Sequence, residues 1–169
     1  MKIKSIDKLI VLLLVLGLTS CVENPMVVKA KVIEDDGNFK MSITPPIEFE
    51  KITPDSTRFF FNDADLYRIL GGGMKKGDVL CSTSTFTIRP LLLENFANRT
   101  VTHQLLLRSF DSTMTIIDTH ILSSYATTPK YSGQMDAQGK ITRTFLDGTK
   151  EYYVLTDRGT FESTNIPNE

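Results

Sequence analysis

Hydrophobic and polar residues alternate along most of this chain, and a two-residue period predicts β-strands with one buried face. Between residues 27 and 32, valine and alanine alternate with two lysines. The same pattern returns at residues 39–43, after the sequence Asp35-Asp36-Gly37-Asn38. Because Asp-Gly and Gly-Asn tolerate the positive φ of tight turns, the two segments are expected to pair as a hairpin.

Further segments of this kind recur about every ten residues and are separated by turn signals. The strands expected from them cover residues 47–51, 58–61, 79–89, 100–108, 113–122, 131–136, 140–145, 151–156 and 159–162. Pro90 is expected to end the strand before it, and residues 71–78, which contain four glycines, are expected to form a flexible linker. Ala137-Gln138-Gly139 and Asp147-Gly148 are the strongest hairpin signals.

Only one segment outside the N-terminal region has a helical pattern. Asn62 or Asp63 could cap a short helix from Ala64 to Leu70, which the glycines after it would end. Many short strands with almost no helix predict an all-β fold, and we expect an antiparallel β-sandwich. A small lipocalin-like barrel is the alternative, although the chain has no Trp and so lacks the Gly-x-Trp signature of lipocalins.

The N-terminus has the anatomy of a secretory signal peptide. Three lysines within the first eight residues precede an apolar run from Leu9 to Leu16, and Gly17 interrupts its end. The apolar stretch is too short for a transmembrane helix, which needs about 20 residues. We therefore expect this segment to be cleaved.

The four residues Leu18-Thr19-Ser20-Cys21 resemble the lipobox of bacterial lipoproteins, and the resemblance covers residues 1–21 only. It implies cleavage before Cys21 and attachment of acyl chains such as palmitate to that residue, which would anchor the protein in the cell envelope. Val22 stands where an Asp would signal retention in the inner membrane, so the resemblance favours the outer membrane. The expected organisation is a signal peptide at 1–20, a lipidated Cys and tether at 21–26, and a single β-rich domain at 27–169.

Charge gives no sign of a nucleic-acid partner. The chain has 19 basic and 20 acidic residues, for a net charge of −1. The signal contains three lysines and one aspartate, so its removal changes the net charge to about −3. Nucleic-acid binding needs a concentrated basic face, and the sequence contains no basic run. Attachment to the membrane is expected to come from the lipid.

The two histidines are weak candidates for a metal site. His103 shares the expected apolar face of its strand with Leu105, so a core or rim position is the simpler interpretation. His120 lies two residues after Asp118, which places both side chains on one side of a strand, where they could bind a metal. The simpler interpretation is that both are exposed polar residues. Zinc needs three or four protein ligands, so these residues make a site only if all three converge. No cofactor is expected.

Other chemical signals are few. No Gly-x-Ser-x-Gly motif is present, and Cys81 is interpreted as a small buried residue. Asp55-Ser56-Thr57 and Asp111-Ser112-Thr113 resemble the O-glycosylation acceptor pattern of some exported bacterial proteins, which makes Ser56 and Ser112 possible acceptors.

These observations favour a lipid-anchored envelope protein with a non-catalytic binding or scaffolding domain. The alternatives are an envelope hydrolase that acts on glycans or peptides and a carrier of an apolar ligand. Expected partners are the membrane, through the anchor, and an envelope protein, a glycan or a small apolar molecule. Aromatic residues would favour a binding surface if they were exposed and a plain core if they were buried. The candidates are Phe59, Phe60, Phe61, Phe96, Tyr152 and Tyr153.

Overall fold

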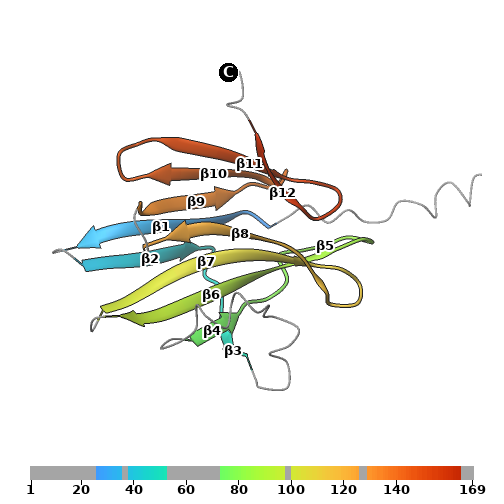
Figure 1. The fold of residues 1–169 in the computed structure, drawn as a ribbon, viewed down its shortest axis with the longest axis horizontal. Coiled ribbons are helices and arrows are strands. Elements are labelled where there is room, and N and C mark those ends of the chain that lie inside the picture. The colour runs from blue at the N-terminus through green and yellow to red at the C-terminus, as the bar shows by residue number, and fades with distance from the viewer. Residues whose placement is uncertain (1–25, 36–37, 53–72, 98–99, 126–128, 165–169) are drawn as a thin grey trace, which may run out of the picture.

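The computed structural model describes residues 26–35, 38–52, 73–97, 100–125 and 129–164, and every regular element in these ranges is a β-strand (Figure 1). The strands are β1 (Val28–Asp35), β2 (Asn38–Thr44), β3 (Glu50–Lys51), β4 (Gly73–Lys76), β5 (Cys81–Ser82), β6 (Thr87–Ala97), β7 (Thr100–Phe110), β8 (Ile116–Ser124), β9 (Tyr131–Met135), β10 (Lys140–Phe145), β11 (Lys150–Leu155) and β12 (Phe161–Thr164). The prediction of an all-β fold is confirmed. The helix expected at residues 64–70 lies outside the described residues.

All strands pair antiparallel in the order β12-β11-β10-β9-β8-β7-β6-β4-β3, with β1 joined to β9 and β2, and β5 joined to β6. The two ends of this order do not pair, so the sheet is open. An open sheet is consistent with the predicted sandwich and differs from the closed barrel that was the alternative. None of the described residues forms a helix that is long and apolar enough to cross a bilayer.

The sheet divides into two layers between β8 and β9. These strands pair only at Ser124 and Tyr131, whereas β9 pairs with β10 along its full length and with β1 over residues 28–30 of β1. We therefore distinguish a first layer, β2-β1-β9-β10-β11-β12, from a second layer, β3 to β8. Figure 1 shows the strands β9 to β12 above β6 and β7.

The inner faces of both layers share one hydrophobic core. Its buried members are Val28, Ala30, Leu80, Cys81, Phe86, Ile88, Leu105, Leu107, Leu122, Met135 and Ile141. In β1 the predicted alternation is confirmed, because Val28, Ala30 and Val32 are buried while Lys29 and Lys31 are exposed. The outer face of the first layer is therefore left to polar side chains.

A second cluster covers the other face of the second layer, where Met74, Leu91, Leu93, Leu106 and Phe110 are buried. The strands β6 and β7 are thus apolar on both faces, in agreement with their leucine-rich sequences.

The C-terminal hairpin is fastened to the second layer by hydrogen bonds. The backbone N–H of Phe161 donates to Oδ2 of Asp118 at 2.8 Å, and Oγ of Ser109 donates to the carbonyl oxygen of Gly159 at 2.6 Å. A Cβ atom on Gly159 would lie only 2.9 Å from the ring of Phe86. This end of the two layers is therefore closely packed.

Two predictions near the middle of the chain were wrong. Residues 79–89 do not form one strand ended by Pro90, because β5 is short and β6 starts at Thr87 and passes through Pro90. The Pro90 carbonyl accepts a hydrogen bond from Gly77 N at 2.9 Å, and N and C=O of one strand residue point to the same side. The nitrogen that lacks a hydrogen therefore faces the Gly77 side, and the β6–β7 ladder loses no bond.

Residues 71–78 were expected to be a linker, but residues 73–76 of this segment form β4. This strand pairs with the leucine-rich part of β6, so Met74 contributes to the second cluster. Pairing with a distant strand outweighs the local preference of a glycine-rich segment for irregular structure.

The close approach of β9 to β8 makes a prediction at Gly133. A Cβ atom there would lie 1.9 Å from the carbonyl oxygen of Leu122, so any side chain forces the two strands apart. We expect Gly133→Ala to lower the free energy of unfolding by about 3 kcal/mol. Gly73→Ala is the matched control, since nothing lies within 4 Å of its Cβ position. Urea unfolding of the full chain measures both, and equal stability of the two variants would contradict the proposed close approach.

Candidate functional site

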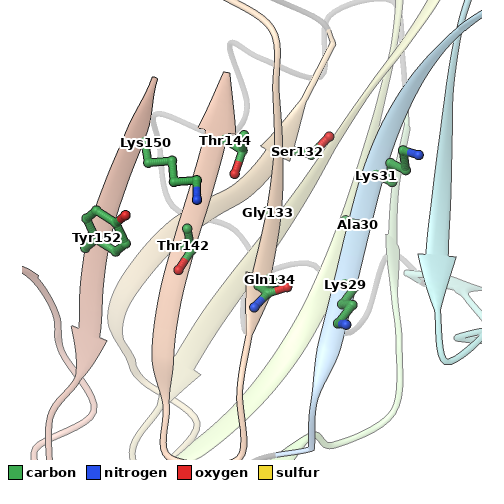
Figure 2. A pocket seen from close by; sticks show the side chains of 10 residues that line it. All are labelled: Lys29, Ala30, Lys31, Ser132, Gly133, Gln134, Thr142, Thr144, Lys150 and Tyr152. Carbon is green, nitrogen blue, oxygen red and sulfur yellow. The ribbon is translucent and has the colours of Figure 1, made fainter. Parts of the chain in front are cut away.

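An open groove with a volume of about 440 Å³ lies on the outer face of the first layer (Figure 2). Its lining residues come from β1, β9, β10 and β11 and are Lys29, Ala30, Lys31, Ser132, Gly133, Gln134, Thr142, Thr144, Lys150 and Tyr152. Apart from Ala30 and Gly133, these residues point their side chains outward, because the residues between them, such as Ile141, face the core.

Strand register orders the lining into two rows that cross the layer. In one row, Lys29 pairs with Gln134, Gln134 with Thr142, and Thr142 with Tyr152. In the adjacent row, Ser132 pairs with Thr144 and Thr144 with Lys150, while Lys31 lies on the β1 side of the groove. Figure 2 shows the lysines of β1 on one side, Lys150 and Tyr152 on the other, and the hydroxyl and amide side chains between them.

All charged residues that line the groove are lysines. Lys29, Lys31 and Lys150 are exposed, and none of them forms an ion pair with a described residue. The lining contains no acidic residue. Since the whole chain has a net charge of −1, the groove concentrates positive charge on a protein that is otherwise slightly acidic.

The polar groups of the groove are hydrogen-bond donors and acceptors suited to binding. The hydroxyl of Ser132 accepts the backbone N–H of Val32 at 2.9 Å, which fixes this side chain beside β1. Two threonines and Gln134 offer further donors and acceptors. The residues that line the groove include no His, Cys, Asp or Glu.

His103 belongs to a separate row of polar side chains at the end of the second layer. Its Nε2 lies 3.3 Å from Oε1 of Glu94, the residue opposite on β6, and Nζ of Lys75 donates to the same oxygen at 2.9 Å. On its other side, Nδ1 contacts the hydroxyl of Tyr125. The imidazole is partly buried at the rim of the inner face, and both of its nitrogens have partners.

The electrostatics of this row favour a structural role. Burial opposes the charge of Glu94, but hydrogen bonds and charge from Lys75 and His103 outweigh it and lower the pKa of the carboxyl group. Burial, with the nearby charge of Glu94, raises the pKa of Tyr125 above its usual 10. Tyr125 therefore stays a neutral phenol, which is the opposite of an activated nucleophile.

His120 is buried, and the expectation that it is an exposed polar residue was wrong. It is 5 % exposed and packs edge-on against Tyr153, with ring centroids 4.5 Å apart, and beside Phe161 at 5.3 Å. Within the described ranges, its Nε2 has no hydrogen-bond partner. Both aromatic rings come from the C-terminal hairpin, so no pattern close to His120 in the sequence indicates its burial.

Asp118 does not pair with His120, because its two oxygens accept the backbone N–H groups of Thr119 and Phe161 at 2.7 and 2.8 Å. His120 lies opposite Leu107, four residues along β7 from His103, which corresponds to about 13 Å. The three candidate ligands therefore do not converge. Within the described part of the chain, no group of three His, Cys, Asp or Glu side chains could hold a metal ion.

The remaining candidates divide between described and undescribed residues. Ser112 is exposed in the turn between β7 and β8, where Oδ1 of Asp111 accepts the backbone N–H of Thr113 at 2.8 Å. Cys81 is buried in the core, as its interpretation required. Tyr152 lines the groove, whereas Tyr153 packs against the shared core. Cys21, Ser56, residues 59–61 and the side chain of Phe96 lie outside the described part.

No protein-family model, curated protein or solved structure matches the chain.

Local sequence patterns did not predict the groove, although Tyr152 was among the aromatic residues expected to form a binding surface. Four pairs of polar residues two positions apart, at 29 and 31, 132 and 134, 142 and 144, and 150 and 152, were the local signal of the groove. Each pair is typical of any exposed strand face, and only the strand order shows that they lie side by side.

The burial of His120 predicts how stability depends on pH. Burial, with the positive charge of Arg143 nearby, lowers the pKa of His120 from 6.5 to about 3. Between these values the unfolded chain binds a proton that the folded chain does not, so stability falls as the pH falls from about 6.5 to 3. The contribution is about 1.4 kcal/mol for each pH unit.

Urea unfolding between pH 7 and 4 tests this prediction on the wild type and His120→Leu. The variant should lose this part of the pH dependence, while His103→Gln should keep it. An unchanged slope in His120→Leu would contradict the assignment.

Proposed function

We propose that this protein is a lipid-anchored component of the bacterial cell envelope, in the outer membrane, whose β domain binds an anionic ligand in the groove. The anchor is inferred from the signal and lipobox pattern of residues 1–21. The binding function is carried by one observation, the three lysines around a groove that contains no acidic side chain.

The composition of the groove supports an anionic ligand over the apolar ligand considered above. Apart from Tyr152 and Ala30, the lining consists of charged and neutral polar residues and Gly133. Small-molecule sites for apolar ligands are lined mainly by hydrophobic side chains. Unpaired lysines instead attract negative charge and add to the rate of association.

A hydrolase has less support. Among the described residues, the row Glu94, His103 and Tyr125 is the one place where a carboxylate orients an imidazole toward a hydroxyl group. The raised pKa of Tyr125 and its burial oppose nucleophilic attack by this hydroxyl. We therefore assign this row to stability.

Titration with tripolyphosphate, a small polyanion, tests the binding function. In NMR spectra of the full chain in nonionic detergent, we expect saturable shifts of backbone amides along β1, β10 and β11. Lys31→Gln combined with Lys150→Gln removes one charge from each side of the groove and should weaken binding about tenfold, since 1.4 kcal/mol corresponds to that factor.

The matched control combines Lys51→Gln with Arg158→Gln. Both residues are exposed and neither lines the groove, so this variant has the same net charge but should bind as the wild type does. Equal weakening in the two double variants would show that tripolyphosphate responds only to net charge, and it would overturn the groove as the binding site.

The anchor has its own test. Mass spectrometry of the membrane-extracted protein should find a mature N-terminus at Cys21 with acyl chains on this residue, and Cys21→Ala should accumulate as the unprocessed precursor. An unmodified Cys21, or a mature N-terminus elsewhere, would end the lipoprotein proposal without affecting the groove.

A further inference from the structure

We propose that the ligand of the groove is a strand of acidic polysaccharide that crosses β1, β9, β10 and β11 roughly at right angles to them. This inference rests on the proposed anion-binding function and specifies its ligand class. It is drawn from the spacing of the lysines, the neutral groups between them and the position of Tyr152.

The spacing of the strands that carry the lysines favours an extended ligand. Lys29 and Lys31 lie on β1 and Lys150 lies on β11, three strand positions away, with β9 and β10 between. Neighbouring strands are about 4.8 Å apart, so the two sides are separated by about 14 Å. This is the distance between the backbones that carry the lysines, and a chain with repeated acidic groups can contact the lysines of both sides.

The middle of the groove suits the hydroxyl groups of a sugar. Gln134, Thr142 and Thr144 lie between the lysines and are neutral donors and acceptors. A ligand with charged groups alone would form no hydrogen bonds with these side chains, which would stay hydrated. A polysaccharide chain presents hydroxyl groups between its acidic groups and can pair with both kinds of side chain.

Tyr152 supplies a flat apolar surface at one end of a row. It lies opposite Thr142, is partly exposed and lines the groove next to Lys150. Aromatic rings with a polar tip offer a large contact area with little loss of conformational entropy. The ring can stack against the apolar face of one sugar unit while Lys150 binds an acidic group beside it.

A single aromatic residue argues against nucleic acid as the ligand. Grooves for single-stranded nucleic acids stack successive bases on several aromatic side chains, and the lining of this groove contains one. The recessed shape argues against a flat anionic membrane surface, which would contact the rim lysines but not the threonines between them.

Calorimetry of the full chain in nonionic detergent tests the ligand class. The probes are polygalacturonate, the neutral polysaccharide dextran, poly-L-glutamate, oligo-dT and vesicles that contain phosphatidylglycerol. We expect polygalacturonate to bind at least tenfold more tightly than any other probe. Binding should weaken with added NaCl, because the lysines are exposed to screening.

Variants at Tyr152 separate sugar stacking from charge. Tyr152→Leu should weaken the binding of polygalacturonate about tenfold but change the affinity for tripolyphosphate by less than twofold, because the substitution removes the ring and no charge. Tyr152→Phe keeps the ring and should restore most of the polygalacturonate affinity. Thermal unfolding of each variant checks that the fold is retained.

The outcomes distinguish this inference from the proposed function. If tripolyphosphate occupies the groove and poly-L-glutamate, oligo-dT or the vesicles bind as tightly as polygalacturonate, the sugar ligand is wrong and the anion-binding function stands. If polygalacturonate binds equally well to Tyr152→Leu, the stacking role is wrong. If neither tripolyphosphate nor polygalacturonate shifts the backbone amide NMR signals of the groove residues, both proposals fail.

Discussion

The structure depends on the packing of the two inner faces around one hydrophobic core. Val28 and Ala30 of β1 meet Leu105, Leu107 and Leu122 of the second layer, and these residues are almost completely buried. Because successive residues of a strand point to opposite faces, burial of one set of side chains fixes the other set in water. The groove is a direct consequence, since its lysines and threonines are the residues between those of the core.

Close backbone packing and hydrogen bonds hold the two layers together, in addition to apolar contacts. At Gly133 the backbone of β9 comes so close to β8 that no side chain fits. At the other end, Asp118 and Ser109 bind the backbone of the C-terminal hairpin. Backbone N–H groups of Thr119 and Phe161 occupy the two oxygens of the Asp118 carboxylate, and His120 packs between aromatic rings, so this His and Asp do not form a site although they lie two residues apart.

The two histidines show how much the partners of a residue decide its chemistry. His103 lies at a rim, where Glu94 and Tyr125 satisfy both ring nitrogens. His120 lies between aromatic rings, and burial lowers its pKa to about 3. One ring is therefore part of a polar row and the other acts as a neutral core residue, although both histidines lie in strands with alternating patterns.

The sequence by itself determined the all-β class, the hairpins at Gly139 and Gly148, and the buried face of β1, because these follow from local periodicity and from the positive φ that glycine permits. The proposed lipid anchor also rests on the sequence alone, through the resemblance of residues 18–21 to a lipobox. Only the tertiary structure decided the strand order, the passage of β6 through Pro90, the burial of His120 and the groove. Each of these depends on which distant strands become neighbours, and residues as far apart as Lys29 and Lys150 have no local pattern that relates them.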